Sequence, residues 1–299
     1  MMRAYATALA GLLVCGVASA QVQRTFVASY GSDANTATNC GFANPCRGFA
    51  AAQAVTQEGG EIIALDAAGY GPIAITKSIT LTANPGFYAG ISASSGAAVT
   101  IDENTAKVVL RGLNINGVGG SMGILMTDGI RLTVENSVIS GFSGAGIKLS
   151  SDSSKVKIVN TTVRGNGAQG IYVTAGDVDI STSKILDNGH IGVWVFAAGG
   201  SNASATVSDT VSSGNQWGFV SSNNTGTSSR MMLIRVTASG AISSGVQTEG
   251  GTLTIGYSNI SNNFLGFNNS SGTLETLGNN LLRGNVSDTA GVITTVSGR

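Results

Sequence analysis

An apolar residue recurs along most of this chain at intervals of 21 to 27 residues, and this recurrence restricts the fold more than any other feature. A varying interval of this length is typical of stacked coils that are joined by loops of different length. The sequence therefore predicts a solenoid. The recurring residues, which we call the anchors, are Leu110, Val134, Ile158, Ile180, Val207, Ile234, Ile255 and Leu277.

The same pattern surrounds each anchor. The residues two before and five after it are usually apolar, which indicates a strand, a turn and a second strand. A glycine followed by an apolar residue comes eleven or twelve residues after most anchors and begins a third strand, at Gly146, Gly170, Gly192, Gly218, Gly245 and Gly266. We therefore predict an all-β, parallel solenoid with three short strands per coil. A leucine-rich repeat has a similar period, but its leucine-dense consensus and its helices are missing.

Asparagine stands eight residues after five of the anchors, at Asn166, Asn188, Asn215, Asn263 and Asn285. Its amide can hydrogen-bond to the equivalent amide one coil away, so we expect a ladder of asparagines in one buried turn.

Charged residues give an independent test of the register between coils. Alignment of Ile158 with Ile180 places Lys155 beside Asp177, and Lys157 beside Asp179, on adjacent strands about 4.8 Å apart. We interpret these as exposed pairs that each contribute about 0 to 1 kcal/mol.

Residues 1–20 have the pattern of a secretory signal peptide. Arg3 precedes an apolar run over residues 6–18, and a small-residue triplet ends at Ala20, where we expect cleavage. The mature chain is then secreted or periplasmic. Cys40 and Cys46 are its two cysteines, and in an exported chain they are expected to form a disulfide.

The composition excludes two classes of partner. The chain has 16 basic and 16 acidic residues, so no basic surface for nucleic acid is expected. No segment after the signal peptide reaches the roughly 18 apolar residues of a membrane-spanning helix.

Residues 25–29, Gly31-Ser32-Asp33, Pro45-Cys46 and residues 50–54 carry a family resemblance, together with the repeat. The chain resembles the right-handed parallel β-helix superfamily of pectate lyases, polygalacturonases and phage tailspikes, and it looks like an uncharacterised bacterial exported member. The resemblance implies a capping segment at residues 21–60, with a strand and a short helix, followed by a β-helix domain at residues 61–299. Phe49, Ala52 and Val55 have helical spacing and agree with such a cap.

The catalytic motifs of these enzymes are mostly missing. Hydrolases of the superfamily use paired aspartates, which this chain lacks, and its one histidine is His190. An atypical lyase or glycosidase site would have to use Arg164, Lys184, Asp187 and His190. Asp102-Glu103 is a candidate for calcium, although no further acidic residue is predicted beside it. We assign no confident catalytic residue, no metal site and no cofactor.

A row of outward residues on the third strand is the more informative feature. It contains Lys148, Tyr172, Trp194, Val220, Gln247 and Asn268. Tyr172 and Trp194 would be neighbours able to form a flat aromatic strip for sugar rings, with Lys148 at one end. The alternative is that the insert at residues 197–204 covers these two rings.

Three functions remain open from the sequence. The first is binding of polysaccharide or cell-surface glycan without established catalysis, the second is a polysaccharide lyase or glycosidase, and the third is a structural or adhesive surface module. We expect a monomer in which residues 292–296 fold across the last coil as a cap, with end-to-end association as the alternative.

Overall fold

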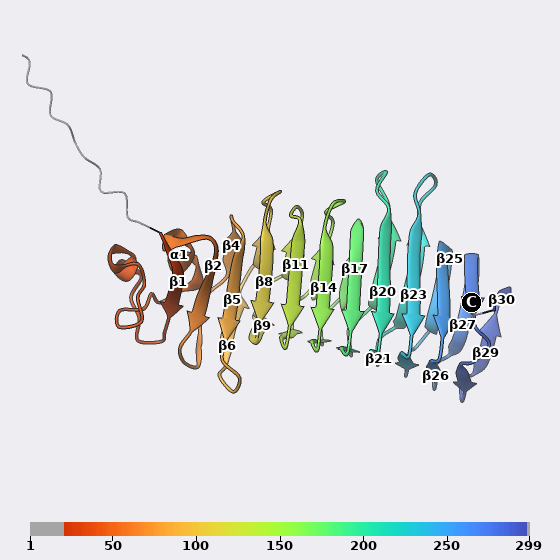
Figure 1. Ribbon diagram of the computed structural model, residues 1–299. Helices are drawn as coiled ribbons and strands as arrows, with labels where there is room; N and C mark the ends of the chain where they lie inside the picture. Colours follow the sequence, from red (N-terminus) through yellow and green to blue (C-terminus); the bar gives the residue numbers. More distant parts are fainter. Residues whose placement is uncertain (1–20, 298–299) are drawn as a thin grey trace, which may run out of the picture.

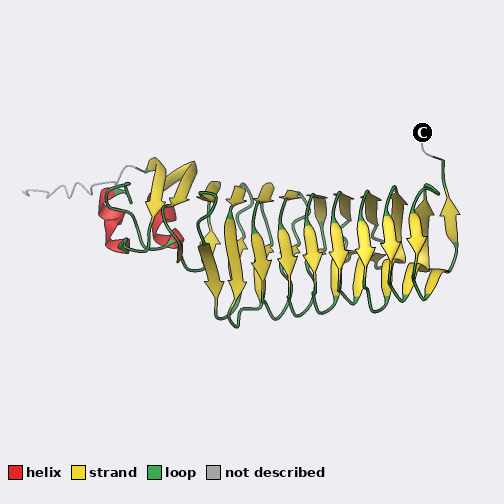
Figure 2. Cartoon of the chain, turned by 90° about the horizontal axis from the view of Figure 1, so that it is seen from below, coloured by secondary structure: helices red, strands yellow, loops and turns green. Residues whose placement is uncertain are grey.

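A computed structural model describes residues 21–297, and these form an all-β parallel solenoid of about nine turns. Figure 1 shows the strands side by side along one axis, and Figure 2 shows that both helices lie at the N-terminal end. The proposed signal peptide lies outside the described residues. Among those described, no helix is both long enough and apolar enough to cross a bilayer.

The strands form three parallel stacks, which confirms the predicted three strands per coil. Stack A consists of β4 (Ile73–Ile75), β7 (Ala97–Ile101), β10 (Met122–Met126), β13 (Ile147–Leu149), β16 (Ile171–Val173), β19 (Ile191–Ala197), β22 (Trp217–Asn223), the first part of β25 (Ser244–Gly256), the first part of β27 (Leu265–Thr276), and β29 (Ser287–Ala290).

Stack B carries the anchors. It consists of β1 (Val22–Val27), β2 (Thr56–Ala64), β5 (Ile79–Ala83), β8 (Lys107–Arg111), β11 (Arg131–Glu135), β14 (Lys155–Val159), β17 (Gly176–Ser181), β20 (Ala203–Ser208), β23 (Ser229–Ile234), the second parts of β25 and β27, and β30 (Ile293–Thr295).

Stack C follows stack B after a short turn. It consists of β3 (Ala68–Gly69), β6 (Ala89–Ala93), β9 (Leu113–Gly117), β12 (Val138–Ser140), β15 (Thr162–Arg164), β18 (Lys184–Leu186), β21 (Val211–Ser213), β24 (Thr237–Ser239), β26 (Asn259–Ser261) and β28 (Leu281–Arg283).

Six of the eight predicted anchors are buried and lie in register from coil to coil. The other two were assigned one residue too late. Leu233, not Ile234, pairs with Val207 and Ile255 and points into the core, and Thr276, not Leu277, pairs with Ile255. Residues 231–234 are all apolar, so the alternation of inward and outward residues could not fix the phase of that strand.

The asparagine ladder is present, with one interruption. Asn166 Nδ2 donates to Asn188 Oδ1 at 2.9 Å, and Asn188 Nδ2 donates to Asn215 Oδ1 at 3.0 Å. The ladder is interrupted where Ala241 occupies the equivalent position, and it resumes between Asn263 and Asn285 at 3.0 Å. These amides satisfy turn groups that the stacking of coils removes from water.

A second ladder, built from hydroxyl groups, lies in the turn between stacks B and C. The side-chain oxygens of Ser183 and Thr210 accept hydrogen bonds from the backbone N–H groups of Thr161 and Ser183, at 3.2 and 3.3 Å. Equivalent bonds run from Leu113 to Ser137, from Val236 to Ser258, and from Ser258 to the amide of Asn280.

The predicted charge register is confirmed, because Lys155 pairs with Asp177 and Lys157 with Asp179 across β14 and β17. Within the described chain, however, neither pair comes within ion-pair distance, and Asp177 instead accepts a hydrogen bond from Ser204 at 2.5 Å. The side chains are exposed, so water competes with the pairing.

The first elements of the chain lie beside the first coil. β1 pairs in parallel with β2, and α1 (Phe49–Val55) turns Phe49, Ala52 and Val55 onto the core. A short 3-10 helix, η1 (Asp33–Thr38), was not predicted.

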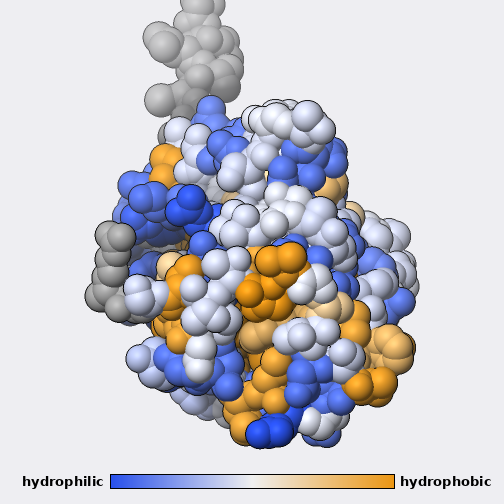
Figure 3. All heavy atoms as spheres, turned by 90° about the vertical axis from the view of Figure 1, so that its right-hand side faces the viewer, coloured by the Kyte–Doolittle hydropathy of each residue, from blue (hydrophilic) through white to orange (hydrophobic). Residues whose placement is uncertain are grey.

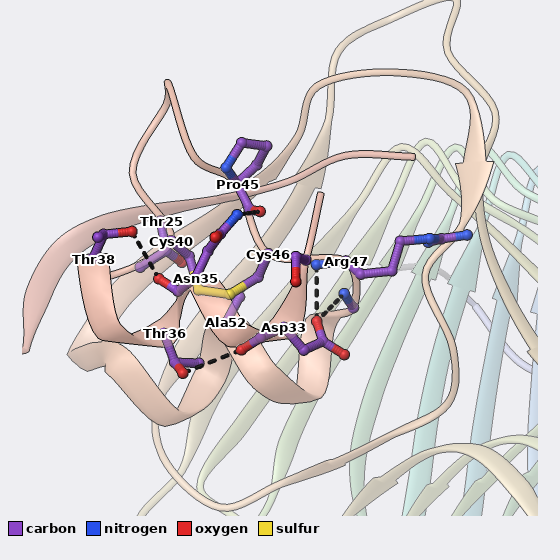
Figure 4. The surroundings of a disulfide bond; sticks show 12 residues. Thr25, Asp33, Asn35, Thr36, Thr38, Cys40, Pro45, Cys46, Arg47 and Ala52 are labelled. Carbon is purple, nitrogen blue, oxygen red and sulfur yellow. Dashed lines mark hydrogen bonds between the residues drawn. A yellow bond between two sulfur atoms is a disulfide. The ribbon is translucent and has the colours of Figure 1, made fainter. Parts of the chain in front are cut away.

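The Cys40–Cys46 disulfide is present and closes the loop before α1, with 4.9 Å between the Cα atoms. Figure 4 shows the Asp33 carboxylate beside it, accepting from the backbone N–H groups of Arg47 and Gly48 at 2.8 and 2.9 Å. The carboxylate and the disulfide thus hold the same loop against the cap.

The C-terminal end differs from the prediction. β30 does not fold across the core, because it pairs in parallel with β27 and adds another strand to stack B. Stacking supplies the backbone groups of β27 with partners, which a strand lying across the core would not do. Figure 3 shows apolar side chains on this end face, and Leu281, Val286 and Val292 have exposed fractions of 56%, 77% and 75%.

Candidate functional site

The row predicted to point outward on stack A lies in the predicted register, from Lys148 through Tyr172, Trp194, Val220 and Gln247 to Asn268. Val220 and Gln247 are nevertheless buried, so the accessible part of the row is interrupted after Trp194. The pleat turns every second side chain of these short strands away from the core. The ring centroids of Tyr172 and Trp194 are 4.7 Å apart, with 15° between their planes. Lys148 Nζ lies 5.7 Å from the centroid of the Tyr172 ring.

Phe196 extends this group, because it lies two residues beyond Trp194 on the same strand. Its ring is 5.0 Å from that of Trp194, with 19° between the planes. Within the described chain, Tyr172 and Phe196 each stack on Trp194 and are not in ring contact with each other. We call Lys148, Tyr172, Trp194 and Phe196 the aromatic ridge.

This stacking corrects the expected geometry of the strip. Rings that stack on one another cover their own faces and direct their edges outward, so Tyr172 and Trp194 do not form a flat surface. Trp194 is further fixed by its Nε1, which donates to Ser222 Oγ at 2.6 Å. Alternation predicted which residues point outward, but ring orientation depends on side-chain torsions that alternation does not determine.

His190 and Trp217 lie beside the ridge, and only the first was singled out from the sequence. Their rings are 4.8 Å apart at 67°, and the His190 ring lies 6.4 Å from Trp194. His190 Nδ1 is buried and has no hydrogen-bond partner within the described residues. Trp217 immediately precedes the glycine that begins its coil's third strand, which is the signal that could have identified it.

The ridge is half-buried, with Tyr172, Trp194 and Phe196 all partly accessible. The insert after β19 forms hydrogen bonds with the coils on both sides. Asn202 Oδ1 accepts from the backbone N–H of Ser228 in the next coil at 2.9 Å, and the Asn202 carbonyl accepts from the backbone N–H of Gly176 in the previous coil at 3.1 Å. Burial raises the pKa of the Tyr172 phenol above its ordinary value.

The four candidate catalytic residues do not form one group. Arg164 and Lys184 point outward from stack C, where they pair with Leu186 and Thr162. Asp187 follows in the next turn and shares a shallow hollow of about 350 Å³ with Arg164, whereas His190 lies beside the ridge. No hydrogen bond or ion pair links the side chains of these four residues in the described structure.

The proposed calcium position is occupied by local hydrogen bonds. Asp102 Oδ1 accepts from Thr127 Oγ1 at 2.6 Å, and Glu103 Oε1 accepts from Thr105 Oγ1 at 3.1 Å. Over residues 21–297, no three histidine, cysteine or acidic side chains come close enough together to hold a metal ion.

Comparison with known proteins agrees with this architecture. A family model described as a right handed beta helix region matches residues 20–207 and 89–298. No curated protein sequence matches the chain.

Three solved structures illustrate the likeness. The crystal structure of a pectate lyase superposes with a TM-score of 0.67 at 16% identity, covering 92% of this chain and 78% of the lyase. The A-module of a mannuronan C-5 epimerase from Azotobacter vinelandii gives a TM-score of 0.52 at 11% identity, covering 92% and 89%. Tailspike protein 2 of the Escherichia coli O157:H7 bacteriophage CAB120 gives 0.58 at 14%, covering 84% of this chain and 39% of the tailspike. At these identities the likeness concerns the fold alone.

Proposed function

Because the chain belongs to the right-handed β-helix family, whose fold is shared with carbohydrate-active proteins, we propose that it binds a polysaccharide along stack A without catalysing its cleavage. The observation that carries the proposal is the aromatic ridge. Three stacked rings and a lysine lie half-exposed beside one another on stack A. Single exposed apolar side chains are common on protein surfaces, whereas a cluster of them often marks a binding site.

The outer rim of the ridge offers suitable chemistry. Within the described residues, the Tyr172 hydroxyl has no hydrogen-bond partner, and the Lys148 ammonium has no carboxylate partner. These groups can bond to sugar hydroxyls or carboxylates, while the ring edges contact C–H groups. Lys148, Tyr172 and Trp194 follow one another on coils about 4.8 Å apart, which suits a ligand that extends along the solenoid axis over these coils.

Two of the similar structures bear the names of polysaccharide-modifying enzymes, a pectate lyase and a mannuronan epimerase. This supports a carbohydrate ligand by analogy of fold.

The separation of the four candidate catalytic residues supports a non-catalytic role. Glycoside hydrolysis needs two carboxyl groups on either side of one bond, and the hollow beside Arg164 contains Asp187 alone. His190 lies beside the ridge, but among the described residues no carboxylate contacts the His190 ring.

We further propose that residues 1–20 direct export. The Cys40–Cys46 disulfide supports this, since such bonds persist in oxidising compartments outside the cytosol. N-terminal sequencing of the protein from culture fractions tests it, and a chain still beginning at Met1 would contradict cleavage near Ala20.

The binding proposal is tested by affinity electrophoresis in gels that contain neutral or uronate-rich polysaccharides. The wild type should be retarded by at least one of them, and Trp194→Ala should weaken binding about tenfold, or ~1.4 kcal/mol. Tyr172→Phe keeps the stack and removes only the rim hydroxyl, so a smaller loss is expected. Phe264→Ala removes an exposed aromatic side chain elsewhere and is the matched control.

Two results would contradict the proposal. One is equal retardation of the wild type and Trp194→Ala, with unchanged melting temperatures. The other is release of unsaturated or reducing sugars by the purified protein, which would favour the lyase or glycosidase.

A further inference from the structure

The turn between β5 and β6 carries an insertion that is absent from the neighbouring coils. From β8 to β26 the chain passes from stack B to stack C through one or two residues, whereas residues 84–88 form a five-residue loop at this point. The loop projects at the lower edge of Figure 1, beside β6. It contains two aromatic residues, Phe87 and Tyr88, and both are exposed.

Tyr88 holds the loop in place. Its ring lies over Gly90, where a Cβ atom would be 2.7 Å from a ring carbon, so a side chain at this position would displace the ring. Its hydroxyl accepts a hydrogen bond from Asn116 Nδ2 at 2.7 Å, and Asn116 Oδ1 accepts from Ser140 Oγ at 3.1 Å. The loop is therefore tied to the two following coils.

Phe87 faces a cleft between this loop and the coils behind it. The cleft has a volume of about 500 Å³, within the range of about 300 to 1,000 Å³ that is usual for small-molecule sites. Residues 84–87 form one wall, and Arg111, Asn114 and Asn136 line the other. The exposed fraction of Phe87 is 42%, which leaves part of its ring free for a ligand.

The polar groups of the cleft both donate and accept hydrogen bonds. The side chains of Asn84 and Asn114 have no partner among the described residues, and Asn136 uses its Oδ1 to accept from Asn160 and keeps its NH₂ group free. Amides arranged in this way can bond to several hydroxyl groups at once.

The cleft carries little net charge. Its one cation, Arg111, donates through Nε to Glu135 Oε1 at 2.6 Å, so a carboxylate already balances the guanidinium. An anionic ligand would gain little from such a site. A neutral molecule with one apolar face and several hydroxyl groups matches an aromatic ring beside free amides.

From these contacts we propose that the cleft is a second binding site, which takes a single unit of a neutral sugar with its C–H face on Phe87 and its hydroxyl groups on Asn84, Asn114 and Asn136. The site lies at the turn between stacks B and C, not on the outward row of stack A. It therefore does not depend on ligand binding by the aromatic ridge.

The test is ligand-observed saturation-transfer NMR on the mature protein, with the methyl glycosides of glucose, galactose and mannose as probes and galacturonate as the anionic comparison. At least one neutral glycoside should receive saturation from the wild type. Phe87→Ala should weaken its binding about tenfold, while Phe87→Trp, which keeps an aromatic face, should retain it. Asn114→Ala tests the polar side of the cleft, and Phe264→Ala is the control for loss of an exposed ring.

The proposal fails if no neutral glycoside is saturated by the wild type, or if correctly folded Phe87→Ala gives the wild-type signal. Stronger saturation of galacturonate than of the neutral probes would overturn the assignment of a neutral ligand. If Phe87→Ala does not fold, unchanged binding by Asn114→Ala would be the contradicting result.

Discussion

Replacing Asn188 by alanine removes one rung of the asparagine ladder and should be among the most destabilising single changes in the turns. Asn188 Oδ1 accepts from the backbone N–H of Asn166 at 3.2 Å and from Asn166 Nδ2 at 2.9 Å. Both residues are almost fully buried, so water cannot replace the lost acceptor. Asn215 Oδ1 keeps one donor, the backbone N–H of residue 188.

The expected magnitude follows from the groups left unpaired. Two buried donors lose their acceptor, and each costs about 1 to 3 kcal/mol, so Asn188→Ala should lower the free energy of unfolding by about 2 to 6 kcal/mol. Urea unfolding followed by circular dichroism measures this difference by linear extrapolation. Asn259→Ala is the matched control, because the buried Oδ1 of Asn259 has no partner to lose, and it should stay within about 0.5 kcal/mol of the wild type.

The interruption at Ala241 allows the opposite experiment. Asn263 Oδ1 already accepts from the backbone N–H of Ala241 at 2.9 Å, and Ala241→Asn would add a second donor to that oxygen. We expect a gain of about 0.5 to 1.5 kcal/mol. A loss of less than about 1 kcal/mol in Asn188→Ala, together with no gain in Ala241→Asn, would show that the ladder contributes little to stability.

Three further outcomes are expected. Ile180→Asp places a charge in the core and should cost about 4 kcal/mol or more, whereas Asp179→Ser should change stability by less than about 0.5 kcal/mol; similar losses in urea unfolding would disprove the assignment of inward and outward sides. Reducing Cys40–Cys46 should cost about 2 kcal/mol, because the closed loop is short, and an unchanged melting temperature in dithiothreitol would contradict this. Burial and a hydrogen bond to Asp66 raise the pKa of Tyr70, so its contribution to stability is complete below about pH 10 and is lost as pH rises through the folded pKa; Tyr70→Phe should weaken this alkaline dependence in urea unfolding.

The repeat predicted the coil and most of its register because burial selects apolar residues at fixed positions. Ile158 and Ile180 could be aligned correctly since charged residues precede each of them at alternate positions and must point outward. Leu233 could not be told from Ile234 within an apolar run, and the polar Thr276 occupies an anchor position near the open end, where burial is incomplete.

The candidate site was predicted in part. Alternation identified Tyr172 and Trp194 as neighbours, and the same rule applied two residues further would have found Phe196. Ring orientation depends on torsions and on contacts such as that with Ser222, which no pattern of one sequence contains. The cleft at Phe87 depends on residues from three coils, and its only sequence signal was two aromatic residues after a Pro-Gly turn.

The two ends of the solenoid also impose an order on its assembly. The cap with α1 and the disulfide lies at the N-terminal end, which is synthesised first, and its disulfide and the pairing of β1 with β2 lie within residues 22–64. Each following coil can then pack on a coil that has already folded, since a coil contacts only its neighbours. The last described coil is poorly buried, with Leu281, Val286 and Val292 exposed, so unfolding of the described residues should begin there and spread towards the N-terminus. Coils are therefore expected to fold from the N-terminal end towards the C-terminal end, and to unfold in the opposite order.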